Sequence, residues 1–338
     1  MELDAERIPG TGRVQAQGQM GGLEVFAEKA LQLSSRLKQE VSKSLVGMDR
    51  LCENLLVCLI AEGHVVLEGV PGVAKTTLAK RFSESMELAF HRIQFTPDLL
   101  PADILGNYYY SPSTGNFSLR KGPIFGSIVL ADEINRSPPK TQSALLECMQ
   151  ERQATIEGTT LPMQLPFLVL ATQNPIELEG TYPLPEAQID RFLFKLHVGY
   201  PDEEGELRML EMKNSAIENG PSRVLASPAA LLGLIQAARN VHVDGMVLRY
   251  IRDIVLATRR NGNVSLGGSP RASEHFLKAA KAKALTTGRT YVTPDDVQTL
   301  ARPILLHRLI LKVDAELEGV TPGAVIEQVL NTVPVPRI

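Results

Sequence analysis

The alternation of hydrophobic and polar positions divides the chain into two parts. Up to about residue 199, short apolar runs alternate with stretches that have the spacing of helices. The apolar runs are HVVLEG at 64–69, FHRIQF at 90–95, SIVLADE at 127–133, FLVLATQNP at 167–175 and FLFKLHV at 192–198. Such runs are typical of parallel strands that helices bury on both faces. We therefore predict an α/β domain with its functional groups at the carboxyl ends of the strands.

Helical spacing dominates from residue 200 onward, and strand signals almost disappear. The expected helices cover about 202–218, 229–239, 246–261, 271–287 and 294–306, with one more candidate at 321–333. We place a domain boundary near Tyr200. This leaves an α/β domain over 23–199 and a helical domain over 200–338.

Three stretches depart from this alternation. Residues 1–22 are rich in glycine and glutamine, so we expect a flexible tail ahead of a helix over about 23–43. Residues 104–120 and 153–165 each combine strand-forming residues with a central turn, which is the pattern of a β-hairpin. Both hairpins are predicted to be insertions in the α/β domain.

Composition narrows the class of protein. The 338 residues carry a net charge of −3, which argues against nucleic acid and anionic membranes as partners. The longest apolar run, LLVCLIA at 55–61, is far too short to span a membrane. Cys52, Cys58 and Cys148 form no C-x-x-C pair, so we interpret them as buried thiols in a reducing cytoplasm. The six histidines have no metal-binding spacing.

LEGVPGVAKTTLAK at 67–80 nearly matches the phosphate-binding loop G-x-x-x-x-G-K-[ST]. In such a loop, backbone N–H groups and a helix N-terminus surround the phosphates. Gly69 closes the preceding strand, and Gly72 lets the backbone turn tightly. Lys75 would reach the outer phosphates of a nucleotide, and the Thr76 hydroxyl would ligate Mg²⁺.

Ala74 stands where the pattern has glycine, which leaves a decayed loop or a chance match as alternatives. A right-handed helical conformation at this position would suit alanine better than glycine, so we predict a working loop. The residues expected to bind the nucleotide are Gly69, Val70, Pro71, Gly72, Val73, Ala74, Lys75, Thr76 and Thr77.

Polar side chains follow two of the other predicted strands. Asp132 can hold Mg²⁺, usually through water, and Glu133 can orient and activate an attacking water. The alternative is a strand that ends in two solvated acids. Asn174 could hydrogen-bond the attacking water or the γ-phosphate, but it could equally cap a turn.

Two arginines are candidates for stabilising the charge of phosphoryl transfer. Arg191 ends the short helix expected in PLPEAQIDRF, and Arg271 follows a helix start in GGSPRA. The alternative for each arginine is a surface ion pair.

The order of these motifs resembles the AAA+ ATPases of the MoxR group. The segments that carry the resemblance are GVPGVAKT, VLADEINRSPPKTQSALLECMQE, ATQNP, PLPEAQIDRF and GSPRA, and it extends from about Leu45 to about residue 310. It implies a P-loop AAA+ core with a helical lid domain, and a ring, with a hexamer expected, that holds ATP between subunits. It also implies chaperone-like remodelling or activation of client proteins, often with von Willebrand factor A domain partners.

The resemblance also assigns roles to residues of this chain. Walker A falls on Lys75 and Thr76, Walker B on Asp132 and Glu133, sensor 1 on Asn174 and sensor 2 on Arg271. Val46 and Gly47 match the segment that packs near adenine. Arg191 is our choice for the arginine finger, acting in trans, and Arg136 is the competing candidate.

The two predicted hairpins have counterparts in related rings, where they face the pore or the client. Residues 104–120 match an insertion in helix 2, and 153–165 match the hairpin before sensor 1. Tyr108, Tyr109 and Tyr110 could contact a client, or they could pack against the body of the domain.

The residues and the resemblance together predict a cytoplasmic, Mg²⁺-dependent ATPase that works as a ring. Two alternatives remain at this point. One is a DNA-acting motor, because related rings with inserted hairpins include helicases, although the acidic balance argues against it. The other is a non-catalytic nucleotide-binding scaffold, although every chemical group required for hydrolysis is present.

Overall fold

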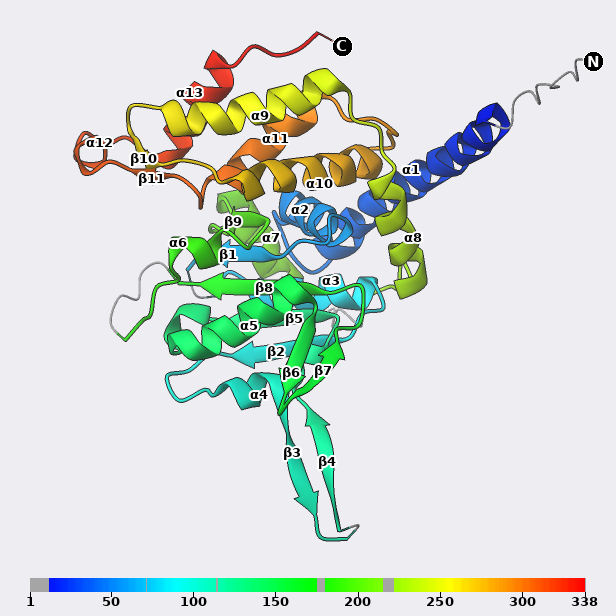
Figure 1. The fold of residues 1–338 in the computed structure, drawn as a ribbon, viewed down its shortest axis with the longest axis vertical. Coiled ribbons are helices and arrows are strands. Elements are labelled where there is room, and N and C mark those ends of the chain that lie inside the picture. Colours follow the sequence, from blue (N-terminus) through cyan, green and yellow to red (C-terminus); the bar gives the residue numbers. More distant parts are fainter. Residues whose placement is uncertain (1–11, 71, 114, 175–179, 215–221, 338) are drawn as a thin grey trace, which may run out of the picture.

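A five-stranded parallel sheet lies at the centre of the N-terminal part of the molecule (Figure 1). The computed structural model describes residues 12–70, 72–113, 115–174, 180–214 and 222–337. The strands follow the order β2-β5-β8-β1-β9 across the sheet. They span Val65–Glu68 (β1), Phe90–Gln94 (β2), Ile128–Asp132 (β5), Leu168–Gln173 (β8) and Phe194–His197 (β9). Each predicted apolar run contains one of them, so the predicted parallel sheet is confirmed.

Alternate residues of each strand pack into different layers. In β1, the side chains of Val65 and Leu67 belong to one apolar cluster, which includes residues of α1, α2 and α3. The side chain of Val66 belongs to a second cluster, which includes residues of α5. These helices span Gly12–Ser42 (α1), Asp49–Ile60 (α2), Lys75–Ser85 (α3) and Pro139–Glu151 (α5). Burial on both faces explains why β1, β5 and β8 are almost wholly apolar, whereas β2, at one edge of the sheet, is largely exposed and mixes apolar and polar residues.

The first helix is longer than the sequence suggests. α1 begins at Gly12, so residues 12–22 are helical and not part of the expected flexible tail. Residues 1–11 lie outside the described part of the chain. Glycine lowers helix propensity, but this cost is small enough for a long packed helix to extend through such residues. The predicted tail therefore was too long.

Both predicted hairpins are present. β3 (Gly106–Ser111) pairs with β4 (Asn116–Lys121), and β6 (Gln153–Ile156) pairs with β7 (Thr159–Pro162). The β3–β4 hairpin extends away from the body of the molecule (Figure 1). It follows α4 (Pro101–Leu105).

The aromatic side chains of the β3–β4 hairpin have different surroundings. Tyr109 and Tyr110 are half-exposed, and Phe117 is 71% exposed. The Tyr110 and Phe117 rings pack edge to face. The hydroxyl of Tyr108 donates a hydrogen bond to Thr159 of the second hairpin, over 3.3 Å. Of the two roles considered for these tyrosines, packing within the domain therefore fits Tyr108 better than it fits Tyr109 and Tyr110.

The C-terminal part is mainly helical, as expected. Its longer helices span Glu203–Asn214 (α7), Pro228–Arg239 (α8), Gly245–Arg260 (α9), Pro270–Thr286 (α10), Pro294–Leu305 (α11) and Pro322–Thr332 (α13). Its shorter elements are α12 (Val313–Leu317) and the strand pair β10 (Val264–Leu266) and β11 (Ile310–Leu311), while the α/β part also contains η1 (Pro123–Phe125), η2 (Ile134–Arg136) and α6 (Glu186–Ile189). Four of the six longer helices begin with proline directly after Ser or Thr. These starts follow capping preferences that can be read from sequence.

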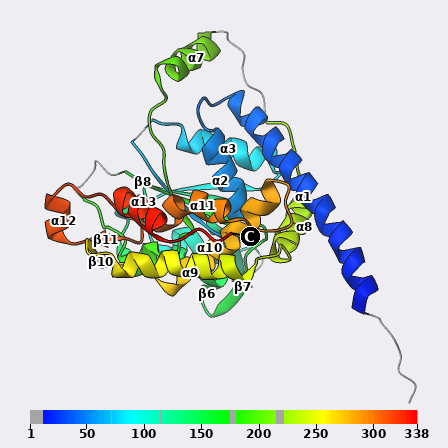
Figure 2. The same ribbon diagram turned by 90° about the horizontal axis from the view of Figure 1, so that it is seen from above.

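The two parts share one continuous apolar cluster. α1 contacts α2 and α3 of the α/β part and α8 and α10 of the helical part, so it packs against both parts (Figure 2). The predicted domain boundary near Tyr200 falls between β9 and α7. Within the described ranges, none of the helices combines the length and the apolarity needed to cross a bilayer.

Candidate nucleotide site

The loop between β1 and α3 is held close to the end of β9. A Cβ atom at Gly69 would lie 2.3 Å from the carbonyl oxygen of Val198, so only glycine fits there. Gly72 has a φ of +85° and open space around it, so its requirement for glycine is conformational. Pro71, which the sequence analysis includes in the loop, lies outside the described residues. Glycine is therefore required at position 69 by the lack of space for a side chain and at position 72 by the backbone conformation.

Ala74 does not have the conformation expected from the sequence. It is the N-cap of α3 with φ 56° and ψ 25°, which is left-handed and not right-handed helical. In this region the Cβ atom of an L-residue crowds the backbone, and glycine is the residue that avoids the crowding. The consensus glycine thus matches the backbone better than Ala74 does, and our physical reason for the alanine was wrong.

Lys75 reaches back across the loop. Its ammonium group donates a hydrogen bond to the carbonyl oxygen of Gly69 over 2.6 Å. Burial lowers the pKa of Lys75, and the charges of Asp132 and Glu133 act in the opposite direction. The structure therefore brings the loop lysine within electrostatic reach of both acids that follow β5.

Asp132 is held by two neighbouring strands. Its carboxylate accepts a hydrogen bond from the Thr172 hydroxyl of β8 over 2.6 Å. It also accepts one from Arg92 of β2 over 2.7 Å, as part of an ion pair. A carboxylate has about four lone-pair positions, so these bonds leave acceptor capacity for a further ligand or water.

The backbone at Glu133 departs from the extended conformation of β5. Its φ is 57°, a left-handed conformation that turns the chain into η2. Its backbone N–H donates to the Thr172 hydroxyl over 2.8 Å, and its carboxylate accepts from the Gln94 amide over 2.8 Å. Arg136 lies 3.4 Å from the same carboxylate. Arg136 is therefore an ion-pair partner of Glu133 within its own chain.

Asn174 follows β8 at the same edge of the sheet and is 7% exposed. Thr76 is half-buried in the first turn of α3, and Thr77 is exposed. A candidate metal site needs oxygen ligands, and the Thr76 hydroxyl and the Asp132 carboxylate are oxygen donors of the kind that Mg²⁺ binds. Together with nucleotide phosphates these residues fit Mg²⁺. No group of three or more metal-binding side chains occurs among the described residues.

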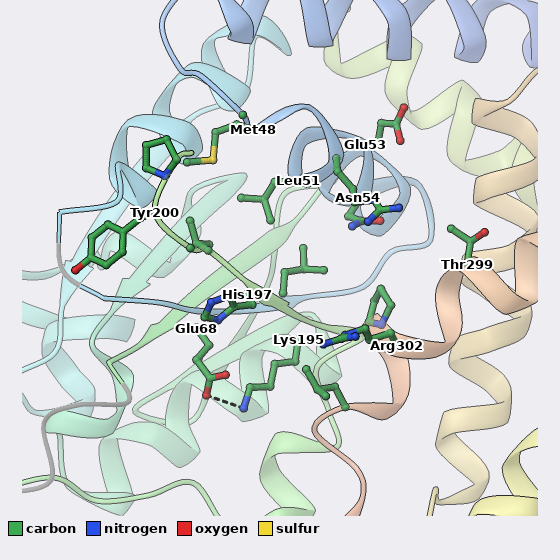
Figure 3. Close-up of a pocket in the computed structure, with 18 of the residues that line it drawn as sticks. Met48, Leu51, Glu53, Asn54, Glu68, Lys195, His197, Tyr200, Thr299 and Arg302 are labelled. Atoms are coloured by element: carbon green, nitrogen blue, oxygen red, sulfur yellow. Dashed lines mark ion pairs between the residues drawn. The ribbon is translucent and has the colours of Figure 1, made fainter. Parts of the chain in front are cut away.

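A cavity of about 780 Å³ lies beside the loop, between the α/β and helical parts (Figure 3). Val46 and Gly47 line it, together with Tyr200 after β9 and Arg302 of α11. The Lys195–Glu68 ion pair, 2.7 Å long, lies at one end of this cavity. The volume is within the usual range for small-molecule sites. The segment expected near adenine therefore lines a cavity of adequate size.

The two other arginines do not point at the acids of this site. One nitrogen of the Arg191 guanidinium donates to the carbonyl oxygen of Leu146 over 3.3 Å. Arg191 lines a second cavity, of about 270 Å³, against α5. Arg271 at the start of α10 forms an ion pair with Asp190 over 3.3 Å.

Comparison with known proteins decides the family. The family profile described as "ATPase family associated with various cellular activities (AAA)" matches residues 64–194, and the profile "AAA lid domain" matches 256–329. Chaperone MoxR1 of Mycobacterium tuberculosis is 45% identical over 327 residues, which are 94% of this chain and 86% of MoxR1. The chain belongs to the MoxR group of AAA+ ATPases.

Two further relatives agree with this AAA+ assignment. YeaC of Bacillus subtilis is 44% identical over 311 residues, which are 92% of this chain and 97% of YeaC. The crystal structure of a protein of Cytophaga hutchinsonii described as a "putative ATPase" superposes with a TM-score of 0.87 at 41% identity, and covers 96% of this chain and all of that one. The AAA+ fold with its C-terminal lid and the ATPase activity predicted from the motifs are confirmed.

This AAA+ ATPase places three site residues at its sheet edge that the sequence analysis missed. They are Arg92 and Gln94 of β2 and Thr172 of β8. Thr172 is a polar residue near the end of an otherwise apolar strand, which is a visible signal, whereas β2 mixes apolar and polar residues, so Arg92 and Gln94 do not stand out in it. Their contacts depend on β2 and β8 both pairing with β5, and the sequence does not reveal that strand order.

Proposed function

We propose that this ATPase hydrolyses ATP at sites shared between neighbouring subunits of a ring, and uses the energy to remodel or activate client proteins. The observation that carries the proposal is the arrangement at the end of β5. Lys75 lies within electrostatic reach of Asp132 and Glu133, and both acids bond to Thr172. One edge of the sheet thus carries a lysine that can bind phosphates, Lys75, and a carboxylate that can activate water, that of Glu133.

In this proposal each residue has a distinct task. Backbone N–H groups of 69–77 and the N-terminus of α3 bind the phosphates, and Lys75 exchanges its bond to Gly69 for the outer phosphates. Glu133 accepts a proton from the attacking water, and Asn174 orients that water. The cavity lined by Val46 and Gly47 receives the base.

Magnesium fits the oxygen ligands of this site. Mg²⁺, when bound by Thr76 and by Asp132 through water, would neutralise developing charge on the phosphate oxygens. Thr172 and Arg92 hold the Asp132 carboxylate in place for that contact. Arg271 is proposed to contact the phosphates when the lid closes, which requires it to leave Asp190.

Several features support a ring with a trans-acting arginine. Arg191 contacts α5 and not the acids of its own site, whereas Arg136 already pairs with Glu133 of the same chain. We therefore favour Arg191 as the residue that completes the site of a neighbour. A hexamer is the expected ring size.

The client-facing surface is proposed to include the β3–β4 hairpin. Its exposed Tyr109, Tyr110 and Phe117 offer an aromatic contact surface of the kind that protein interfaces favour. A relative with 45% identity is named a chaperone, and a von Willebrand factor A domain protein is one possible client. Three free, buried cysteines are consistent with the proposed cytoplasmic location.

A subunit-mixing experiment tests the shared site. Arg191→Ala subunits keep Glu133 but cannot supply the arginine, and Glu133→Gln subunits have the reverse defect. Alone, Arg191→Ala is expected to lose about 10³-fold in turnover or more, and Glu133→Gln at least about 10²-fold. A site in the mixed ring is complete when an Arg191→Ala subunit supplies Glu133 and its neighbour, a Glu133→Gln subunit, supplies Arg191. In an equal mixture each condition is met half of the time, so about a quarter of the interfaces are active.

Recovered turnover in the mixture, with both variants alone inactive, supports a site shared by two subunits. Absence of recovery in mixed rings of normal size would show that Arg191 acts within its own chain or has no role. Sedimentation of the mixture establishes the ring size in the same samples.

A further inference from the structure

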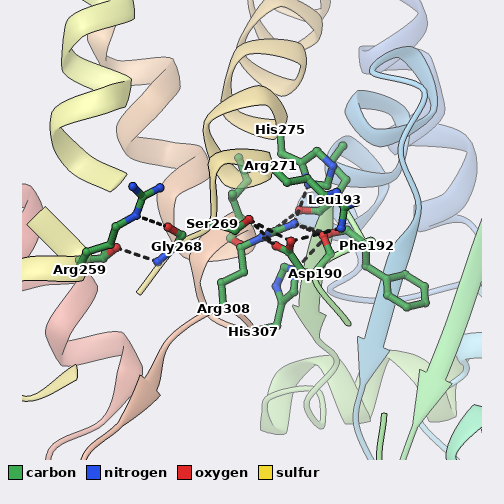
Figure 4. A network of polar contacts seen from close by, with 12 residues as sticks. Asp190, Phe192, Leu193, Arg259, Gly268, Ser269, Arg271, His275, His307 and Arg308 are labelled. Atoms are coloured by element: carbon green, nitrogen blue, oxygen red, sulfur yellow. Dashed lines mark hydrogen bonds and ion pairs between the residues drawn. The ribbon is translucent and has the colours of Figure 1, made fainter. Parts of the chain in front are cut away.

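Asp190 is the centre of a polar network between the α/β core and the lid (Figure 4). It lies directly after α6, and its carboxylate is 17% exposed. Three lid residues donate to that carboxylate. The Ser269 hydroxyl donates over 2.9 Å, Arg308 over 2.7 Å and Arg271 over 3.3 Å. Three lid side chains thus converge on one core acid, and that acid directly precedes Arg191.

Arg308 holds the backbone on both sides of Arg191. One guanidinium nitrogen donates to the carbonyl oxygen of Asp190 over 2.9 Å and to that of Phe192 over 2.7 Å. The Arg308 side chain is 1% exposed, and burial lowers its pKa to about 10. Several bonds from one planar, charged group fix geometry much more strongly than a single flexible contact would. The position of the Arg191 backbone therefore follows the position of the lid.

The Arg191 side chain points to the opposite side of this segment. It donates to Leu146 of α5, while the residues before and after it bond to the lid. The Ser269 hydroxyl is used for Asp190 and makes no capping bond to α10, although Ser269 is the N-cap residue. The start of the lid helix that carries Arg271 is thus tied to the same acid.

We propose that Asp190 is a positioning residue, which together with Arg308 sets the geometry of Arg191 according to the position of the lid. This rests on the proposed role of Arg191 in trans. When Arg271 leaves Asp190 for phosphates, the carboxylate keeps Arg308 and Ser269, and the segment 190–192 moves with the lid. The lid of one subunit thereby controls the arginine that the subunit offers to its neighbour.

The test adds Asp190→Asn to the subunit that supplies only the arginine. Glu133→Gln subunits with and without Asp190→Asn are mixed with Arg191→Ala subunits, and the recovered ATP turnover is compared. Because the supplying subunit cannot hydrolyse ATP, effects of Asp190 on its own site do not enter the measured rate. We expect recovery to fall about tenfold or more, since small displacements of a reacting group have effects of this size.

Asp296→Asn in the supplying subunit is the matched control. Asp296 is a buried acid of the lid whose carboxylate pairs with Arg289 over 2.6 Å and accepts the backbone N–H of Thr293, both residues of the lid itself. Asp296→Asn removes the same charge from another arginine–aspartate pair, so any effect it has measures general weakening of the lid. We expect Asp296→Asn to leave the recovery intact. Arg308→Lys, which keeps the charge but cannot bond several groups at once, is expected to act like Asp190→Asn.

The outcomes separate this proposal from the proposed function. One outcome is that turnover recovers in the mixture of Glu133→Gln and Arg191→Ala subunits, and recovers equally well when Asp190→Asn or Arg308→Lys is added to the supplying subunit. In that case Asp190 has no positioning role, although the shared site stands. Equal loss with Asp296→Asn would also overturn the proposal, because lid stability alone would explain it. If the original pair never recovers, the trans role of Arg191 fails, and this inference fails with it.

Discussion

At the scale of single residues, one hydroxyl group organises the candidate site. Thr172 is 1% exposed, donates to the Asp132 carboxylate and accepts the backbone N–H of Glu133. It therefore fixes both acids relative to β8. A buried hydroxyl that serves two partners is difficult to replace, because its loss leaves a buried N–H group unsatisfied.

Thr172→Val removes both bonds and keeps the shape of the side chain. We expect the free energy of unfolding to fall by about 1–3 kcal/mol, the cost of an unsatisfied buried group. ATP turnover should fall about tenfold through misplaced acids, while ATP affinity stays near normal. Urea unfolding, steady-state turnover and nucleotide titration measure the three quantities. Thr172→Ser, which keeps the hydroxyl, is the control, and normal turnover in Thr172→Val would contradict the role.

Ala74→Gly relieves a left-handed conformation at the start of α3. Glycine has no Cβ atom, so the substitution relieves crowding in the folded state and stabilises it. It also raises the entropy of the unfolded chain, which offsets part of this gain. We expect a net increase of about 0.5–1 kcal/mol in the free energy of unfolding. ATP binding should persist. Ala79→Gly, in the buried interior of α3, is the control and should destabilise the protein. ATP binding that appeared only in Ala74→Gly would show that the natural loop is degenerate.

At the scale of elements, three histidines lie where helices meet the sheet: His64 is buried, and His275 and His307 are partly buried. Burial lowers the pKa of His64 to about 4 and that of His275 to about 2, and it lowers the pKa of His307 well below its usual value. His64 accepts from the Val169 backbone, so it is neutral and donates to the Met149 carbonyl through its other ring nitrogen.

These histidines predict a loss of stability in mild acid. Their imidazoles stay neutral in the folded state, so below about pH 6.5 the unfolded chain binds more protons than the folded one. The free energy of unfolding should therefore fall by up to about 1.4 kcal/mol per pH unit for each histidine. Urea unfolding between pH 7 and pH 5 measures the slope, and His307→Gln should make it shallower. The same slope in both proteins would contradict this explanation.

Elements could be predicted from the sequence more fully than their contacts. Apolar runs locate all five strands of the main sheet because parallel strands are buried on both faces. The capping residues locate most lid helices. α1 begins earlier than predicted because its packed turns from Ala27 onward stabilise the helix, and the exposed Gly21 and Gly22 lower helix propensity too little to end it. The left-handed conformation of Ala74 could not be predicted, since alanine has no preference for it.

At the scale of the whole molecule, the motifs indicate the chemistry, and the fold determines which groups meet. Gln94 and Glu133 are far apart in sequence, yet they bond because β2 pairs with β5. Arg271 and Arg191 belong to different parts of the chain, and Asp190 connects them through contacts that only the folded lid creates. Sequence motifs contain no information on such strand order or lid packing.

Hydrolysis depends above all on Glu133, which activates the water that attacks ATP. Glu133→Gln keeps the shape of the side chain and removes its basicity, so ATP affinity should stay within about twofold of normal while turnover falls at least about 10²-fold. Glu157→Gln, at an exposed hairpin turn, is the matched control and should hydrolyse ATP normally. The decisive measurement is steady-state ATP turnover by Glu133→Gln at saturating ATP. A large loss with retained binding is the predicted result, and turnover equal to that of the unmodified protein would contradict the account.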